Sequence, residues 1–281
     1  TAGSTGNALL SATGTQWIRT TNGTVARATP FAQPSPATPL VSMRVAALGT
    51  GRANIESGAS QLIELDYPVQ MQGGTLDGRL IVGDTAAAGV SRIGAVDQTV
   101  FAKAILVQTG GPGAGTQSEL KSTGTQVIST LNGNLQVLGG NGDNSLAQID
   151  PTNQTVLVNG GVDVFGGIGA NAIAQIISQG IQTLWATNGN ISVTGGLGPG
   201  SNALITALGV QNINPVATLT SNLPTGGGAF AGGAAVPVTN TPGSPSGTVL
   251  ALGDTQIGVI AETEPNDQNE SDPARRAPIC F

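Results

Sequence analysis

Short stretches in which apolar and polar residues alternate recur along most of this chain, separated by glycine-rich turns. Residues 135–138 read Leu-Gln-Val-Leu, and the pattern returns as Val-Asp-Val at 162–164 and Ile-Ser-Val at 191–193. Alternation with a period of two marks a strand that buries one face. We therefore expect these stretches to be strands whose apolar side chains face a shared core.

The alternating stretches return at a nearly constant distance along the chain. Their central valines are separated by 25, 30, 27 and 29 residues; they are Val82, Val107, Val137, Val164 and Val193. A repeat of roughly 28 residues built from short strands and glycine turns is typical of a β-solenoid with one repeat per coil. Stacking would place the valines in a column about 4.8 Å apart, and this column would be the core.

The clearest repeat contains three candidate strands, at residues 135–138, 145–149 and 154–158. We therefore predict an all-β fold, a parallel β-solenoid (β-helix) with about 28 residues and three short strands per coil. The length of the chain allows eight or nine such coils. The opening coil is expected to begin in mid-repeat, because Asn7–Ala12 resembles Asn202–Ala207.

Glycine and amide residues occupy fixed places in the repeat. The pattern Gly-Gly-x-Gly begins at Gly110, Gly139, Gly166 and Gly195. We expect these glycines to meet a need for positive φ or for a tight corner. Asparagine at the opposite corner also tolerates left-handed geometry; it occurs at Asn132, Asn159 and Asn188. The dipeptide Gln-Thr recurs at Gln98, Gln154 and Gln182, which could stack as side-chain amide ladders between coils.

The repeat assigns residues 1–261 to a single solenoid domain. A proline-rich stretch, 28–40, interrupts it as an inserted loop or covering strap, because proline cannot donate to a strand ladder. Residues 41–75 read as a degenerate coil, 222–247 as a loop, and 248–261 as a last strand or hairpin. An acidic C-terminal tail, 262–281, follows and is expected to be mobile unless a partner docks it.

Composition and charge exclude several classes of function. Charged residues make up 9% of the chain and aromatic residues 3%, whereas 39% of residues are apolar. Residues 122–274 contain no lysine or arginine but nine acidic residues. Nucleic acids and anionic membranes need cationic contacts, so neither is an expected partner. No apolar run is long enough for a transmembrane helix, so no membrane insertion is expected.

The beginning of the chain and its cysteine bear on its setting. It starts at Thr1 without a leader, which fits either a mature product whose signal was removed or a fragment. The single cysteine, Cys280, cannot form an internal disulfide. We interpret it as an incidental thiol, the alternative being an intermolecular disulfide or another attachment.

Candidate catalytic residues are few, and we predict that the protein is not an enzyme. The chain has no histidine, which removes Ser-His-Asp and Cys-His catalysis and the commonest zinc sites. Glycan cleavage needs two carboxylates facing one bond. Asp163 is the best-placed strand carboxylate, but Gln136 and Ser192 would be its stacked neighbours. Asp143 and Asp150 flank one strand and do not recur. We expect solvated surface acids and no catalytic or cofactor-binding residues.

Two further motifs have structural readings that compete with functional ones. Residues 139–144, Gly-Gly-Asn-Gly-Asp-Asn, imitate a calcium-binding nonapeptide, but the final position is Asn144 and the period is not nine. We interpret the segment as a turn and expect no metal site. Trp17 and Trp185 are expected at corresponding repeat positions. They could stack against sugars, although a packing or rim position is the preferred reading.

The repeat motif resembles a known family. G-x-[LIV]-x-V-x-G-G-x-G-x-[GN]-x-x-A-x-[IV] followed by Q-T-[VL] is similar to the repeats of filamentous-haemagglutinin-like exoproteins, over residues 80–215 and more weakly in the first coil. These are bacterial surface or secreted β-helices, many exported by two-partner secretion. The chain has no Asn-Pro-Asn-Gly motif at its start, and it is short for such an adhesin. The resemblance implies an extracellular or cell-surface localisation.

Two functions follow from this reading. The first is a structural extracellular protein, a subunit of a surface fibre or matrix that stacks end to end as a head-to-tail homopolymer. A solenoid end exposes unpaired strand edges, and another copy would satisfy them. The alternative is a segment of an adhesin that binds a host surface or glycan through 28–40 and 222–247. A polysaccharide-processing enzyme is the third and least favoured reading.

Overall fold

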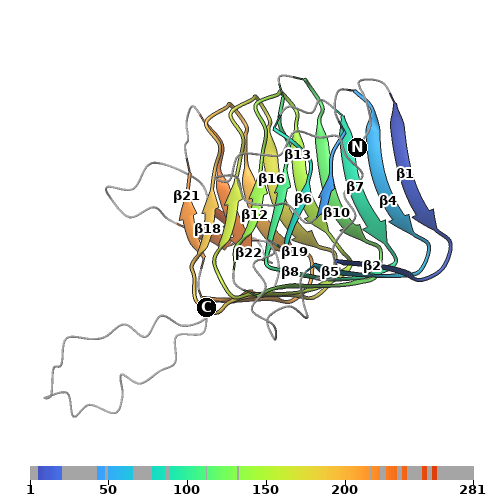
Figure 1. The fold of residues 1–281 in the computed structure, drawn as a ribbon. Helices are drawn as coiled ribbons and strands as arrows, with labels where there is room; N and C mark the ends of the chain where they lie inside the picture. The colour runs from blue at the N-terminus through green and yellow to red at the C-terminus, as the bar shows by residue number, and fades with distance from the viewer. Residues whose placement is uncertain are drawn as a thin grey trace, which may run out of the picture.

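The computed structural model is a β-solenoid made of three parallel sheets (Figure 1). It describes residues 6–20, 43–47, 50–65, 78–85, 89–111, 113–131, 133–215, 217–221, 226–232, 236–238, 249–251 and 255–257. Up to β22, each coil contributes one strand to every sheet, so neighbouring strands of a sheet are three elements apart in the chain; β25, which pairs with β20, is the exception. No helix in the described part is long and apolar enough to cross a membrane.

Each sheet runs the length of the stack. The first sheet has eight strands: β1 (Asn7–Ala12), β4 (Arg52–Ser57), β7 (Val90–Ala95), β10 (Gln117–Ser122), β13 (Leu146–Asp150), β16 (Ile173–Ser178), β19 (Ala203–Ala207) and β22 (Ala229–Gly232). The second sheet also has eight: β2 (Gln16–Thr20), β5 (Ser60–Leu65), β8 (Asp97–Ala102), β11 (Thr125–Thr130), β14 (Asn153–Val158), β17 (Gln182–Ala186), β20 (Gln211–Asn214) and β25 (Thr255–Ile257).

The third sheet has seven strands: β3 (Met43–Val45), β6 (Arg79–Val82), β9 (Ala104–Gln108), β12 (Leu135–Leu138), β15 (Val162–Phe165), β18 (Ile191–Thr194) and β21 (Thr218–Thr220). A separate antiparallel pair consists of β23 (Val236–Val238) and β24 (Val249–Ala251). The predicted parallel solenoid with three strands per coil is therefore confirmed, and sheets of eight and seven strands agree with the expected height of the stack.

The predicted valine column is the core of the third sheet. Val82 pairs with Val107, Val107 with Val137, and Val137 with Val164, which in turn pairs with Val193. All of these valines are buried, with at most 1% of each exposed. Each buried side chain of this size stabilises the fold by about 1.5–3 kcal/mol relative to an exposed one. The stack is therefore held by columns that every coil extends by one side chain.

The strand boundaries of the clearest repeat differ from the expected ones by single residues. The strand at 135–138 is confirmed, whereas 145–149 is observed at Leu146–Asp150 and 154–158 at Asn153–Val158. Ser145 belongs to the preceding corner because its hydroxyl accepts a hydrogen bond from the Gly140 N–H at 3.2 Å. The opening coil and the degenerate coil at 41–75 are both present, since β1 pairs with β4 and β2 with β5.

A buried ladder of glutamines runs inside the second sheet. From the second member onward, each side-chain Nε2 donates to the Oε1 of the glutamine in the preceding coil, at distances of 2.5–3.0 Å; the members are Gln16, Gln61, Gln98, Gln126, Gln154, Gln182 and Gln211. The predicted amide stacking at Gln98, Gln154 and Gln182 is therefore confirmed. Polar glutamine side chains can be buried in the core because those of neighbouring coils satisfy their hydrogen-bonding groups.

The glycines of the Gly-Gly-x-Gly corners are needed for close stacking rather than for positive φ. A Cβ on Gly167 would lie 2.0 Å from the Gly140 carbonyl oxygen, and one on Gly196 would lie 2.0 Å from the Gly167 oxygen. Among these described corner glycines, positive φ occurs at Gly111. The backbone of one coil thus occupies the space that a side chain on the next coil would need.

The left-handed asparagines are not Asn159 and Asn188, and the third predicted position, Asn132, lies outside the described residues. Positive φ occurs at Asn144 and Asn171, both at 55°, which follow the Gly-Gly-x-Gly corners. Asn159 and Asn188 lie at the other corner without positive φ and are explained by hydrogen bonding instead. The Asn188 amide donates to the Asn159 side-chain oxygen. Asparagine therefore recurs at this corner because its side chain forms hydrogen bonds between coils. The prediction had attributed it to left-handed backbone geometry instead.

The C-terminal part is more ordered than the predicted loop at 222–247 implies. β22 lies within that range and pairs in parallel with β19, and Ala229 is fully buried. Small residues in β22 conceal the alternation that identified other strands. In the segment 248–261, β24 forms the antiparallel pair and β25 extends the second sheet by pairing with β20. The proline-rich stretch 28–40, the tail 262–281 and Cys280 lie outside the described residues.

Candidate functional site

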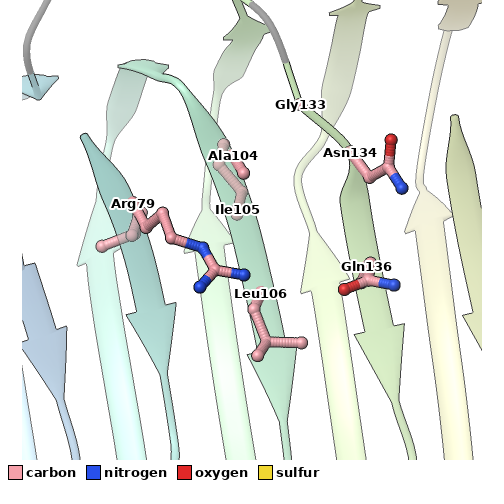
Figure 2. A pocket seen from close by; sticks show the side chains of 8 residues that line it. Arg79, Ala104, Ile105, Leu106, Gly133, Asn134 and Gln136 are labelled. Atoms are coloured by element: carbon pink, nitrogen blue, oxygen red, sulfur yellow. The ribbon is translucent and has the colours of Figure 1, made fainter. Parts of the chain in front are cut away.

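The outer face of the third sheet carries a shallow hollow near the N-terminal end of the stack (Figure 2). Its volume is about 230 Å³, and it crosses the three neighbouring strands β6, β9 and β12. The lining consists of Arg79, Leu80, Ala104, Ile105, Leu106, Gly133, Asn134 and Gln136. The hollow combines one cationic side chain, two side-chain amides and an aliphatic floor.

The register of the sheet explains why the surface is depressed here. Arg79 of β6 pairs with Ala104 of β9, so a long side chain stands beside a methyl group. Ile105 donates its backbone N–H to the Asn134 carbonyl oxygen at 3.0 Å, which brings residue 134 level with this part of β9. Gly133 adds no side chain: a Cβ there would lie 2.8 Å from the Ala104 Cβ. Two small residues between longer neighbours therefore leave space above the sheet.

Neighbouring groups set the orientations of the two amides. The Asn134 Oδ1 accepts the Gly161 N–H at 2.9 Å, so this side chain leans toward the next coil and away from Ala104. The Gln136 Nε2 lies 3.3 Å from the Asp163 Oδ2 and donates to it. A carboxylate only accepts, so the Gln136 nitrogen must face Asp163. Figure 2 shows the Gln136 oxygen directed to the opposite side, toward β9.

Cationic side chains lie on the outer surface of the N-terminal part of the solenoid. Arg44, Arg92 and Lys121 each form an ion pair across coils, with N–O distances of 3.1 Å to Asp84, 3.2 Å to Glu56 and 2.9 Å to Asp150, respectively. Arg79 extends its guanidinium along the outer face toward Leu106 (Figure 2). Lys103, the residue before Ala104, is exposed and forms no ion pair with any described residue. Arg79 thus lines the hollow, and Lys103 directly precedes the lining residue Ala104 in the chain.

A second depression lies at the corner between the second and third sheets. It is lined by Ser129, Thr130, Leu131, Leu157, Val158, Asn159, Thr187 and Asn188. Its polar side chains already bind within the solenoid: the Thr187 hydroxyl donates to the Val158 carbonyl at 3.0 Å, and the Thr130 hydroxyl to the Gly133 carbonyl at 2.8 Å. We interpret this depression as part of the corner packing.

The acidic residues considered for catalysis have structural contacts. Asp163 is stacked between Gln136 and Ser192, as the repeat predicts, and accepts the Gln136 amide. Asp150 pairs with Lys121. The third acid, Asp143, accepts the Ala170 N–H at 2.8 Å. In the described ranges, no group of three or more His, Cys, Asp and Glu residues could hold a metal ion.

The segment 139–144 is a corner of the solenoid. Asn144 has φ 55°, and its Oδ1 accepts from the Asn171 side-chain amide at 3.2 Å, which joins two successive corners. A Cβ on Gly142 would lie 2.2 Å from the Gly113 oxygen, so this glycine is required by the coil beneath it. Contacts between coils account for the resemblance to a calcium-binding repeat.

The two tryptophans do not occupy corresponding positions, contrary to prediction. Register places Trp17 against Leu62 and Trp185 against Leu157 and Asn214, in different columns of the second sheet. Aligning the glutamines at the starts of β2 and β17 puts Trp17 level with Thr183, two residues before Trp185. Trp17 is 61% exposed and donates its Nε1–H to Glu64 at 3.0 Å, whereas Trp185 is 48% exposed.

The hollow beside Arg79 was missed by the sequence reasoning because none of its residues repeats. Arg79 lies on β6, Ala104 and Leu106 on β9 and Gln136 on β12, so no repeated motif marks them. One signal was present: every lysine and arginine of the chain lies before residue 122 or at residues 275 and 276. The charge asymmetry indicated the region, but only the register shows which residues meet.

Comparisons with known proteins leave the family open. A scan of protein-family models, a search of curated proteins and a search of solved structures each found no match to this chain. The β-solenoid is therefore assigned from the structure itself. The resemblance of its repeats to filamentous-haemagglutinin-like exoproteins stays a prediction from the motif.

Proposed function

We propose that this chain is a structural, non-enzymatic protein of the cell surface or extracellular space, a solenoid subunit that assembles end to end. One observation carries the proposal. Leu10 stands in a core column of the first sheet but is 53% exposed, whereas Ile93 and Leu120 in the same column are fully buried. An open core at the end of a stack is a surface that another coil would cover.

The backbone of the first coil supports the same conclusion. β1, β2 and β3 are the terminal strands of their sheets. A terminal strand offers N–H and C=O groups to a further strand, and natural proteins usually cap, charge or twist such edges. Burying Leu10 under another coil would contribute about 1.5–3 kcal/mol to the free energy of association. Backbone hydrogen bonds to the terminal strands would fix the orientation of the added coil. A second copy of the chain is the partner that we propose.

A head-to-tail order is the arrangement we favour for the assembly. The chain through Lys121 contains eight basic and seven acidic residues, whereas residues 122–274 contain acidic residues alone. Contact between the N-terminal end of one copy and the C-terminal end of another therefore involves less charge repulsion than contact between two acidic C-terminal ends. Salt screens such charges beyond about 10 Å, so the bias is modest and should weaken at high ionic strength.

The test is a comparison of two leucine substitutions. Leu10→Glu places a charge on the proposed end surface, whereas Leu208→Glu does so at a corner residue that is 69% exposed. We expect the unmodified protein and Leu208→Glu to form oligomers or filaments in light scattering and electron micrographs, and Leu10→Glu to be monomeric. A monodisperse unmodified monomer at high concentration, without filaments, would refute the proposal.

An adhesin segment that binds a host surface or glycan is the second candidate. The observation that favours it is the uneven coil length: Gln61 follows Gln16 by 45 residues and Gln98 follows Gln61 by 37, whereas later glutamines are 28 or 29 apart. Additional residues in a solenoid coil commonly form loops on a binding face. Deleting 28–40 should remove partner binding and leave assembly intact if this candidate is right; 222–247 cannot be deleted for the same test, because it contains β22 and the buried Ala229.

A further inference from the structure

The outer face of the second sheet differs in chemistry from the outer faces of the other two sheets. Its strands β11, β14, β17 and β20 contain no charged residue. On the first sheet, by contrast, Gln148 donates to the Glu119 carboxylate across coils at 2.7 Å. On the third sheet, Gln136 donates to Asp163 in the same way. The second sheet thus presents an uncharged face over these four coils.

Two rows of side chains cross this uncharged face. Alternation with the buried residues of the same strands directs Thr155 and Leu157 of β14 outward, and likewise Thr183 and Trp185 of β17. Register pairs Thr155 with Thr183, and Leu157 with Trp185. Neighbouring side chains of such a grid are about 4.8 Å apart between coils and about 7 Å apart along a strand. A row of hydroxyl groups therefore lies beside an apolar row.

Both rows are open to a ligand. Leu157 is 43% exposed and Trp185 is 48% exposed. The hydroxyls of Thr155 and Thr183 form no hydrogen bond with any residue in the described part of the chain, and neither does the Trp185 Nε1–H. The face thus combines an exposed apolar platform with unused hydrogen-bonding groups at its side.

The other tryptophan of the chain shows what an engaged indole looks like in this sheet. The Trp17 Nε1–H donates to the Glu64 carboxylate at 3.0 Å, and the Arg19 guanidinium carbon lies 5.5 Å from the centre of the Trp17 ring. Trp185 has neither kind of contact with a described residue. Its ring and its N–H are therefore both left for an external partner.

This combination of groups matches an uncharged sugar. A sugar ring has an apolar C–H face, which packs on aromatic and aliphatic side chains, and an edge of hydroxyl groups. A threonine hydroxyl both donates and accepts, as a sugar hydroxyl does, so the two pair in either direction. The net charge of the protein is −6, which disfavours an acidic ligand on a face that has no cation to offset it.

We propose that the uncharged face of the second sheet binds a neutral, extended polysaccharide of the β-1,4-linked glucan type. The C–H face of one ring packs on Leu157 and Trp185, and hydroxyls at the edge of the ring bond with Thr155 and Thr183. The uncharged face continues over β11 and β20, so further rings of the chain can follow it. Binding involves no covalent step.

The proposed binding is independent of end-to-end assembly, because the face runs along the side of the stack. It also places glycan binding on a sheet rather than on the segments 28–40 and 222–247. Leu10→Glu, which disrupts the proposed end surface, should therefore bind the sugar as well as the unmodified chain does. Loss of assembly and loss of sugar binding can thus be observed separately.

Fluorescence titration of the full chain with cellohexaose tests the proposal. The chain has two tryptophans, so Trp17→Phe leaves Trp185 as the one fluorescent indole. We expect cellohexaose to change the intensity and wavelength of its emission, because a sugar ring over the indole excludes water from it. Oligogalacturonate, in which each ring carries a carboxylate, is the acidic comparison and should bind at least tenfold more weakly.

Calorimetric titration of three further variants with cellohexaose locates the site. Trp185→Ala should weaken binding about tenfold, since it removes the aromatic platform. Thr183→Val keeps the shape of the side chain and removes the hydroxyl, so it should weaken binding about threefold. Leu197→Ala is the matched control, because Leu197 is an exposed apolar residue at another corner, and it should change binding less than twofold. Circular dichroism checks that each variant keeps the β fold.

Four results would overturn the proposal. They are no fluorescence change with cellohexaose, equal binding of oligogalacturonate, equal weakening by Leu197→Ala, and a loss of self-association in Trp185→Ala without sugar binding by the unmodified chain. The last result, measured by light scattering, would show that a second copy of the chain covers this face instead.

Discussion

The first two coils and the five regular coils that begin at β7, β10, β13, β16 and β19 share the same three sheets, yet they differ in spacing, charge and burial. Successive ladder glutamines are 45 and 37 residues apart in the first region, then 28 or 29 apart. Glu56 and Glu64 form cross-coil ion pairs at the N-terminal end, whereas residues 122–217 contain no cation.

The difference shows that one core can support two kinds of surface. The register of the buried columns continues through both regions, since Gln61 bonds Gln98 as Gln98 bonds Gln126. Side chains outside the columns are free to vary, and they vary most near the N-terminal end. The regular coils supply stability, and the first coil supplies an open end, which is the feature that we connect with assembly.

The largest expected difference between the regions concerns their core columns. Val137→Asp would bury a charge in a regular coil where neighbouring valines cover it, and we expect it to cost more than about 4 kcal/mol or to prevent folding. Leu10→Asp in the first coil should cost less than about 1 kcal/mol because water reaches residue 10. Urea denaturation followed by circular dichroism measures both. Equal losses would show that the end is not open.

A smaller difference is expected for two glycines. Gly167→Ala would place a Cβ 2.0 Å from the Gly140 oxygen, and we expect it to destabilise the fold by about 3 kcal/mol. Gly14→Ala in the first coil meets nothing within 4 Å and should change stability by less than about 1 kcal/mol. The midpoint of urea unfolding distinguishes the two. A harmless Gly167→Ala would contradict the close approach of the coils.

The smallest difference is expected within the glutamine ladder. Gln154→Leu removes a member with neighbours on both sides, Gln126 and Gln182, and leaves a buried donor and acceptor unpaired. We expect a loss of about 2 kcal/mol, since each unpaired buried group costs about 1–3 kcal/mol and partial relaxation recovers some of it. Gln16→Leu, which leaves the Gln61 donor as the one affected group among the described residues, should cost about half as much. Similar losses for both would argue that the ladder is not cooperative.

Much of the fold was predictable because the repeat presents each constraint several times. The column from Val82 to Val193 and the strand at Leu135–Leu138 were both predicted from alternation and period. The full glutamine ladder was predicted only in part, because Gln126 is followed by valine and does not share the Gln-Thr dipeptide. β22 was read as a loop because alanine and glycine conceal its alternating pattern.

The candidate site could not be predicted, since it depends on differences between coils rather than on their similarity. Arg79, Ala104 and Gln136 come from three coils whose lengths are unequal, so their proximity needs the observed register. The same limitation explains the wrong prediction for the two tryptophans. Their local sequences are similar and suggested equivalent positions, but the strand register places Trp17 and Trp185 in different columns of the second sheet.

By itself, the sequence determined that this protein is a stack of coils with a valine-rich core, because a period of about 28 residues and a strand period of two leave few other ways to bury those side chains. The tertiary structure alone decided which glycines are tolerated, where the open end lies and that Arg79 and Gln136 line the same hollow. Those features arise from contacts between residues 25 to 45 positions apart, and insertions of unequal length between them conceal the pairing from any local pattern.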